Sequence, residues 1–210
     1  MKTLIIGATG QIGKMTTQKM LQAGHQVVAL VRNKDKLADI HNPHLSVIEQ
    51  DLENDFSHAF KDCDQVIFTA GSGGGTGAEK TILIDLWAAV KAINYAKQYN
   101  IQHFIMVSSI GADTPDSIES SIKPYLVAKH MADQYLLSSG LKYTILRPGT
   151  LLDEPASKGF SFKRPNSRAD AMISRENVAE ALNFVATKSP NDSVIVELFD
   201  GDNKLESFFH

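Results

Sequence analysis

The stretch "LIIGATGQIGKM", residues 4–15, decides the expected fold of this chain. A short apolar run leads into Gly7, Gly10 and Gly13, and a segment of helical character follows directly. The first glycine permits a tight turn, and the second lets the backbone approach a pyrophosphate group. The third lets strand and helix pack closely, and the helix N-terminus attracts negative charge. The stretch therefore predicts a dinucleotide-binding turn, spaced Gly-x-x-Gly-x-x-Gly instead of the commoner Gly-x-Gly-x-x-Gly.

The alternation that begins there continues along the whole chain. Continuous apolar runs of strand length alternate with helical patterns, which is typical of parallel strands that helices bury on both faces. The predicted strands cover residues 3–7, 26–31, 45–50, 65–70, 103–109, 142–148 and 193–199. The predicted helices cover residues 10–24, 79–100, 124–140 and 174–188. Ser174 is a plausible N-cap for the last helix, and a core-facing stripe of the second runs from Ile82 to Ala96.

These patterns predict an α/β fold, a doubly wound parallel sheet of the Rossmann type, in a single domain of residues 1–210 with a small C-terminal substrate-binding part. Residues 150–173 are the one long irregular insertion, and long loops in compact domains are usually functional. We therefore expect residues 150–173 to form a substrate loop or lid.

The bulk composition is that of an ordinary globular protein. The chain has 210 residues, 43% of them hydrophobic and 21% charged, with a net charge of -3 and no basic run for nucleic acid. Its first apolar run is too short for a signal peptide or a membrane span. Cys63, the one cysteine, reads as a small buried filler, and the seven histidines show no metal-binding spacing. We expect a cytoplasmic monomer or homodimer that acts on a small molecule without a metal, membrane or nucleic acid.

Residues at the ends of the second and third strands bear on the choice of cofactor. Sites for NAD usually place an acidic residue after the second strand, but this chain has Arg32. A cation there suits the 2′-phosphate of NADP, so we expect NADP(H) to be preferred and NAD(H) to be possible; the alternative is a solvated arginine. Asp51, after the third strand, has two open interpretations: an acceptor for the adenine amino group or a helix N-cap.

A second group of residues carries possible chemistry. In "PYLVAKH", residues 124–130, Tyr125 and Lys129 are four positions apart and would project from the same face of a helix. The Lys129 ammonium would favour the phenolate form of Tyr125, which could then exchange a proton with a substrate oxygen. Ser108 and Ser109 end the fifth strand, at the sheet edge where such folds bind ligands. Taken separately, the Tyr125–Lys129 pair could be an exposed pair on a helix, and the two serines could form a turn. Here, however, the serines and the pair follow a predicted cofactor loop, in the expected order and on the expected elements.

Together these motifs give the chain a clear resemblance to the atypical short-chain dehydrogenase/reductase group, in its NAD(P)H-binding, NAD-dependent epimerase/dehydratase-like branch. The resemblance covers essentially the whole chain. The motifs that carry it are "GATGQIG" (7–13), "DL" (51–52), "TAG" (69–71), "VSS" (107–109), "YLVAK" (125–129) and "LKYTILRPG" (141–149).

The resemblance implies an NADP(H)-dependent oxidoreductase that transfers a hydride between the nicotinamide and a small carbonyl, alcohol or planar substrate. Tyr125 would be the general acid/base, Lys129 would also bond the nicotinamide ribose, and Ser109 would orient the substrate oxygen, with Ser108 as the fallback. In all, we expect cofactor contacts from Gly7, Thr9, Gly10, Gln11, Ile12, Gly13, Arg32, Asp51, Leu52, Ala70, Gly71, Ser72, Lys129, Pro148 and Leu151.

The chain also departs from the family pattern. No position matches the asparagine that completes the catalytic set of better-known members, and Asn94 does not take over that role. The part after residue 150 is shorter than in sugar-nucleotide epimerases, which argues against a large nucleotide-sugar substrate. Two alternatives stay open: a non-catalytic NADP-binding redox sensor, and an epimerase or dehydratase that recycles its cofactor. Sensors of this type often lack the Tyr-Lys pair, so its presence favours an enzyme.

Two further loops invite interpretation. "GSGGGTGAEKT", residues 71–81, resembles a phosphate-binding P-loop but has Glu79 where the P-loop has glycine. After the fourth strand it would instead carry the second wall of the dinucleotide site, with residues 73–77 as a hinge. Residues 156–168 combine basic and aromatic side chains that could close over an anionic or planar substrate, although a mobile solvated loop is the stronger interpretation. The residues concerned are Lys158, Phe160, Phe162, Lys163, Arg164 and Arg168.

Overall fold

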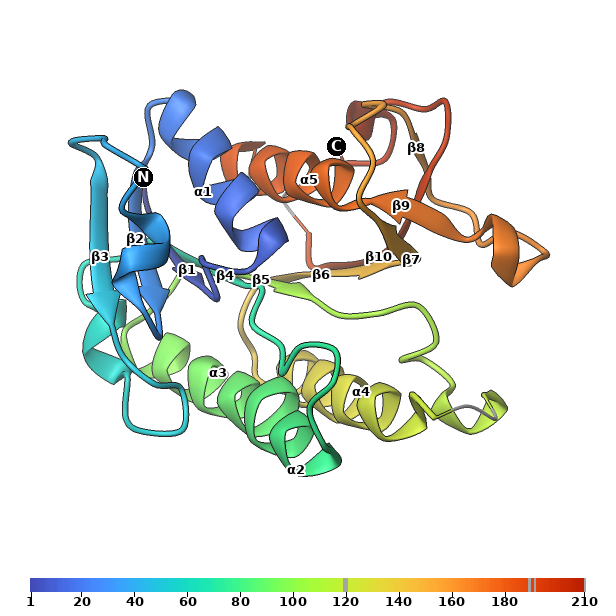
Figure 1. Ribbon diagram of the computed structural model, residues 1–210, viewed down its shortest axis with the longest axis horizontal. Coiled ribbons are helices and arrows are strands. Elements are labelled where there is room, and N and C mark those ends of the chain that lie inside the picture. Colours follow the sequence, from blue (N-terminus) through green and yellow to red (C-terminus); the bar gives the residue numbers. More distant parts are fainter. Residues whose placement is uncertain (119–120, 189, 191, 210) are drawn as a thin grey trace.

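The computed structural model describes residues 1–118, 121–188, 190 and 192–209. Its centre is an eight-stranded sheet in the order β3-β2-β1-β4-β5-β6-β10-β8 (Figure 1). All neighbouring strands are parallel except β8, which runs antiparallel to β10. The strands are β1 (Lys2–Ile6), β2 (Gln26–Val31), β3 (Leu45–Glu49), β4 (Gln65–Phe68), β5 (His103–Val107), β6 (Tyr143–Pro148), β8 (Phe160–Ser161) and β10 (Val194–Asp200). The predicted doubly wound sheet and its seven main strands are confirmed.

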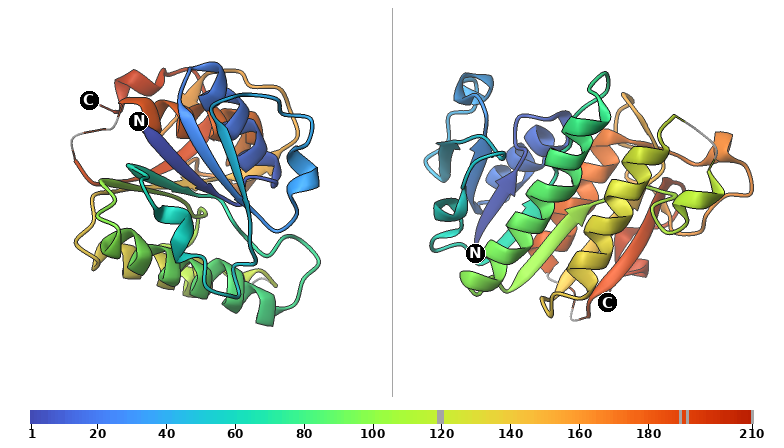
Figure 2. Two further views of the ribbon diagram at one scale, coloured as in Figure 1. Left: turned by 90° about the vertical axis from the view of Figure 1, so that its left-hand side faces the viewer. Right: turned by 90° about the horizontal axis from the view of Figure 1, so that it is seen from below.

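Helices cover both faces of this sheet. In Figure 1, α1 and α5 lie on one face, and α2, α3 and α4 lie on the other. Figure 2 shows α3 and α4 side by side across the sheet. The helices are α1 (Gln11–Gln22), α2 (Ala78–Lys80), the π-helix η3 (Thr81–Ala88), α3 (Ala89–Gln98), α4 (Lys123–Leu137) and α5 (Arg175–Lys188). Short 3₁₀ turns are η1 (Lys34–Leu37), η2 (Ser57–Phe60), η4 (Pro115–Ser117), η5 (Arg168–Asp170) and η6 (Leu205–Ser207). Within the described ranges, no helix has the length and apolar character needed to cross a membrane.

The continuous apolar strands are explained by burial on both faces. Successive side chains of a strand point to opposite faces. In β1, Leu4 and Ile6 therefore pack into the core beneath α3, and Ile5 packs into the core beneath α1 and α5. All three side chains are fully buried. The two helical layers thus require the unbroken "LII" that a half-exposed strand would not have.

The second predicted helix contains an irregularity that its sequence pattern did not indicate. Residues 81–88 form a π-helix, whose hydrogen bonds span five residues instead of four. The wider turn changes which side chains face the core at its start. Ile82, predicted on the core stripe, is 55% exposed, and the buried positions are Thr81, Ile84, Asp85 and Ala88. That prediction was wrong at Ile82 and right further along, at Ala89, Ile93 and Ala96.

The insertion at residues 150–173 is more regular than predicted. Its ends form β7 (Thr150–Leu152) and β9 (Met172–Ser174), which pair in parallel, and β8 inside it pairs with β10. Ser174 caps α5, because its Oγ accepts a hydrogen bond from the Asn177 N–H at 3.0 Å. In Figure 1 the insertion and the loop between β5 and α4 both project beyond the same end of the sheet.

The order of the strands positions the site. The chain winds from β1 outward to β3 on one side, and then returns to place β4 on the other side of β1. Connections at this point diverge to opposite faces, which leaves a crevice beyond the carboxyl ends of β1 and β4. The glycine loop after β1 and the loop after β4 therefore border the same opening.

Candidate functional site

The glycine loop is packed as tightly as its sequence suggested. Gly7 has a φ of +88°, and a Cβ added to it would lie 2.7 Å from the Ala70 backbone nitrogen. A Cβ on Gly13 would collide with the Gly7 carbonyl oxygen. Gly10 has an extended backbone and precedes the first residue of α1, so the N-terminus of this helix faces the crevice. Side chains are thus excluded at both ends of the loop.

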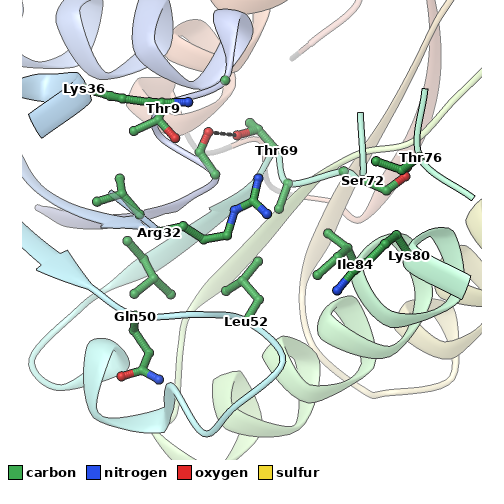
Figure 3. Close-up of a pocket in the computed structure, with 16 residues that line it drawn as sticks. Thr9, Arg32, Lys36, Gln50, Leu52, Thr69, Ser72, Thr76, Lys80 and Ile84 are labelled. Atoms are coloured by element: carbon green, nitrogen blue, oxygen red, sulfur yellow. Dashed lines mark hydrogen bonds between the residues drawn. The ribbon is translucent and has the colours of Figure 1, made fainter. Parts of the chain in front are cut away.

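One cavity, of about 310 Å³, opens over this loop. Its residues come from the glycine loop, the ends of β2 and β3, and the loop after β4. Figure 3 shows Arg32 extending into it, with Lys36 on the side of Thr9. Neither the Arg32 nor the Lys36 side chain forms an ion pair with any residue that the structure describes. The lining includes Gly7, Thr9, Gly10, Arg32, Lys36, Gln50, Leu52, Ala70, Gly71, Ser72 and Lys80.

Of the two neighbouring residues Asp51 and Leu52, only Leu52 lines the cavity. Gln50 does so from the other side of Asp51. The Asp51 Oδ1 accepts a hydrogen bond from the backbone N–H of Glu53 at 2.9 Å, which makes a local turn. A turn follows instead of a helix, so the N-cap interpretation of Asp51 was wrong. Asp51 is not among the residues that line the cavity.

The wall after β4 is held by a residue that the sequence did not single out. The Asp85 Oδ2 accepts a hydrogen bond from the Ser72 backbone N–H at 3.0 Å. A Cβ on Gly71 would lie 3.0 Å from the other Asp85 oxygen. Asp85 is 1% exposed and lies in the π-helix η3. The available signal was a single acid within the apolar run "TILIDLWAAV", which is unusual in a buried helix.

A second cavity, of about 360 Å³, adjoins the first. The two share Thr69, Ala70 and Gly71, so they meet at the end of β4. Residues predicted from four separate segments come together in it. They are Ile12, Ser109, Tyr125, Lys129, Pro148 and Leu151, joined by Ser108 and by two residues that were not predicted, Asp85 and Arg175.

Hydrogen bonds distinguish the two serines of this cavity. The Ser108 hydroxyl is buried and donates to the Asp133 Oδ2 at 3.0 Å, away from bulk solvent. The Ser109 hydroxyl is half-buried and donates to the neighbouring Ile110 carbonyl at 3.1 Å. Ser109 is thus the serine with the more accessible hydroxyl. The Lys129 Nζ donates to the Val107 carbonyl at 2.7 Å, so the end of β5 positions the ammonium.

Behind Lys129 lies a buried ionic cluster. Asp133 is fully buried, and its Oδ2 also accepts hydrogen bonds from Arg147, with an Nε distance of 3.0 Å. Burial raises the pKa of Asp133, while the charges of Arg147 and Lys129 and the Ser108 hydroxyl oppose that rise. The other oxygen of Asp133 has no partner in the described structure. A buried cluster of this kind fixes the end of β6 against α4, beside the second cavity.

The remaining predicted cofactor residue, Gln11, is not among the residues that line either cavity. Its Nε2 donates to the Asp153 Oδ1 at 3.0 Å, and Arg175 donates to the same oxygen at 2.8 Å. The Asp153 carboxylate therefore links the start of α1 to the start of α5. Arg175 follows the N-cap Ser174 directly, and only the three-dimensional arrangement brings it to the cavity.

The basic and aromatic residues of the insertion do not form an open binding surface. Phe160 is 2% exposed, and Phe162 packs between Phe160 and Phe208 in the core beneath α5. These rings are therefore unavailable for stacking on a planar substrate. Arg164 is paired with Asp113 and Glu197, and Lys163 is exposed. The side chain of Arg168 lies outside the described residues.

Cys63 is the small buried residue that its sequence context predicted. It is 8% exposed, and its Sγ donates to the Ala59 carbonyl at 3.6 Å. Burial raises the pKa of its thiol to about 11. A thiol so rarely ionised at neutral pH is not a nucleophile.

Known proteins resemble this chain over most of its length. A family model described as NAD(P)H-binding matches residues 7–188. A Bacillus subtilis (strain 168) relative, named uncharacterized sugar epimerase YhfK, is 38% identical over 209 residues, which are 98% of this chain and 97% of the relative. A solved Bacillus halodurans structure named for the NAD-dependent epimerase/dehydratase group is 37% identical, with a TM-score of 0.90 over 99% of this chain and 97% of that one. The anaerobillin reductase ChuY from Escherichia coli O157:H7 is 25% identical, with a TM-score of 0.80 over 97% and 99% of the two chains. The chain belongs to the NAD(P)H-binding family.

Proposed function

We propose that this chain is an NADP(H)-dependent oxidoreductase that interconverts a small carbonyl compound and its alcohol. The observation that carries the proposal is that Ser109, Tyr125 and Lys129 line one cavity, which adjoins the cavity over the glycine loop. A dinucleotide that spanned both cavities would bring its reactive ring beside the three side chains. The cofactor would supply the hydride, and the chain would supply the proton and the positioning.

The residues present suit such a cofactor. Gly7 and Gly13 let the loop pack closely on itself, and Gly10, which precedes α1 and lines the first cavity, leaves backbone exposed there for a pyrophosphate. Arg32 and Lys36, which lack ion-pair partners among the described residues, suit the additional phosphate of NADP. Ala70 and Gly71 offer a small side chain and none where the two cavities meet, and Ser72 continues this wall in the first cavity. Asp51 makes a local turn, so we assign the adenine contact to Gln50 and Leu52 on either side of it.

The chemistry then follows from the side chains. Ser109 would donate a hydrogen bond to the substrate carbonyl oxygen and so orient the carbonyl group. As hydride reaches the carbonyl carbon, that oxygen would take a proton from the Tyr125 hydroxyl, which leaves an alcohol and a phenolate. The Lys129 ammonium would stabilise the phenolate, and the Val107 carbonyl holds it in place from behind.

Two other functions share much of this site. Epimerase or dehydratase chemistry uses the same hydride transfer but returns it to the substrate, and the name of the Bacillus subtilis relative favours this alternative. A redox sensor would bind NADP(H) and use no proton donor. The half-buried Tyr125 on the wall of the second cavity favours catalysis over the sensor.

Replacing Tyr125 by Phe tests the proposal. We expect turnover to fall by about 10²- to 10⁴-fold, with the Kd for NADPH unchanged, because only the proton donor is removed. Tyr135→Phe, on the outer face of the same helix, is the matched control and should retain full activity. Unaltered turnover in Tyr125→Phe would contradict the proposal. An epimerase would interconvert substrate isomers with no net change in NADPH, and a sensor would consume no NADPH with any carbonyl compound.

A further inference from the structure

A third cavity, of about 250 Å³, lies next to the catalytic one. Its walls come from the loop between β5 and α4 and from the insertion, the two segments that project beyond the end of the sheet in Figure 1. Ser109 lines the catalytic cavity and the next residue, Ile110, lines this one. In the same way, Gly149 lines the catalytic cavity and Thr150 lines the third cavity. The two cavities are therefore consecutive along the ends of β5 and β6.

The charge of this cavity is already compensated. Among the described residues that line it, Arg164 carries the only charge. The Arg164 Nε donates to one Glu197 oxygen at 2.9 Å, and its NH2 group contacts both oxygens of Asp113 at 3.0 Å. Arg164 donates these hydrogen bonds to the carboxylates of Glu197 and Asp113, and the contacts raise the pKa of Arg164, so two acidic side chains compensate its charge. We call this group the Arg164 clamp.

The clamp also fixes the shape of the cavity. Arg164 comes from the insertion, Asp113 from the loop after β5, and Glu197 from β10. It therefore joins the two walls and ties both to the central sheet. The Asp113 pKa is lowered because hydrogen bonds and charge from Arg164 outweigh the effect of burial, so Asp113 remains ionised at neutral pH.

The rest of the lining is apolar or neutral and polar. Ile110, Ile118, Pro165 and Ala171 provide apolar surface. The Thr150 hydroxyl and the Asn166 amide make no hydrogen bond with the residues that the structure describes. Its volume corresponds to about eight water molecules of the liquid, enough for a ring-sized group.

We propose that this third cavity holds the body of the substrate and selects an uncharged carbonyl compound of ring size over one that carries a carboxylate or phosphate there. The inference rests on the proposed function, because the reacting carbonyl must lie at Ser109 and Tyr125. An anionic group would lose its hydration beside a guanidinium that two carboxylates already neutralise. A neutral ring gains apolar contact, and Thr150 and Asn166 offer it hydrogen bonds.

The test compares two alcohols that differ only in one carboxylate. The full chain is saturated with NADPH, so that no hydride acceptor is present and the alcohol cannot react, and benzyl alcohol or 4-(hydroxymethyl)benzoate is titrated in a calorimeter. We expect benzyl alcohol to bind at least tenfold more tightly. Ile118→Trp should fill the cavity and weaken benzyl alcohol at least tenfold, with NADPH affinity unchanged. Val47→Trp, at an exposed position of β3, is the matched control and should change neither affinity.

Asn166→Arg supplies an independent arm, because residue 166 is exposed and its replacement does not disturb the core. The added guanidinium brings one more positive charge to the wall of the cavity and should shift the preference at least tenfold toward the benzoate. Absence of binding by either alcohol, equal affinities in the unmodified chain, or a preference that Asn166→Arg leaves unchanged would overturn the inference. Reduction of benzaldehyde by NADPH is measured in parallel. Selective binding without turnover contradicts the proposed function and supports the cavity assignment, whereas turnover without selectivity does the reverse.

Discussion

The carboxylate of Asp85 holds the backbone of Ser72: its Oδ2 accepts a hydrogen bond from the Ser72 N–H at 3.0 Å. Ser72 belongs to the wall after β4, and Asp85 to the π-helix that follows the glycine-rich loop. The contact therefore closes residues 73–84 into a loop whose ends are fixed. It also places an acid in the lining of the second cavity.

Removing this acceptor should weaken cofactor binding. In Asp85→Ala the Ser72 N–H loses its partner, which costs about 1–3 kcal/mol, and the wall becomes less ordered. We expect the Kd for NADPH to rise about tenfold. Asp85→Asn keeps one acceptor oxygen and should recover most of the affinity. Fluorescence titration with NADPH measures both variants. Equal affinities of Asp85→Ala and the unmodified chain would show that the wall does not depend on this contact.

Arg32 and Lys36 should determine cofactor preference. Both line the first cavity without an ion-pair partner in the described parts of the chain. If they bind the 2′-phosphate, each replacement by Ala should raise the Kd for NADPH about tenfold, the loss of one charge-assisted hydrogen bond. The Kd for NADH should stay constant. Lys34→Ala, outside the cavity lining, is the control. Unchanged NADPH affinity in Arg32→Ala would remove the basis for expecting NADP.

The strands could be predicted from the sequence because buried strands leave continuous apolar runs in it. A strand covered by helices on both faces has a continuous apolar run, residues 4–6 in β1 and 104–107 in β5, and such runs stand out from their polar boundaries. The glycines at 7 and 13 were predictable for a similar reason: close backbone contact leaves no room for a side chain. Local sequence patterns therefore predicted many residues of the first cavity, over the glycine loop. The motifs after β5 and on α4 predicted several residues of the second cavity.

Other features depend on contacts between distant segments. Arg175 reaches the second cavity only because α5 packs beside α1, and no local pattern marks it. The π-helix rotates Asp85 inward and Ile82 outward, against a regular helical period. The aromatic residues of the insertion looked available for a ligand, but the C-terminal segment covers Phe162 with Phe208. Amphipathic sequence alone does not reveal which distant surface will be covered.

Asp133 should be important for stability because it is the carboxylate of a buried cluster. Asp133→Asn leaves Arg147 and Lys129 buried without a counter-charge, and breaking such a pair costs about 3–5 kcal/mol. Urea unfolding measures this loss. Asp39→Asn, which removes an exposed ion pair with Lys14, should cost much less, because water screens an exposed pair. Similar losses in the two variants would contradict a special role for the buried cluster.

His103 gives the fold a pH dependence that is separate from the site. It begins β5, is 2% exposed, and its Nε2 lies 2.9 Å from the Thr144 hydroxyl. Its Nδ1 has no partner in the described structure. Burial, with a smaller contribution from the charge of Lys142, lowers the His103 pKa to about 4.

Stability should therefore fall as the pH is lowered from about 6.5 to 4, because in that range the unfolded chain binds a proton at His103 that the folded chain does not. Above pH 6.5 this part of the free energy of unfolding is fully present. By pH 4 the free energy of unfolding has fallen by about 3 kcal/mol, at about 1.4 kcal/mol per pKa unit. Urea unfolding at several pH values measures it. His103→Gln cannot titrate and should lose this part of the slope, whereas the exposed His58→Gln should retain it. An identical slope in His103→Gln would assign the pH dependence to other groups.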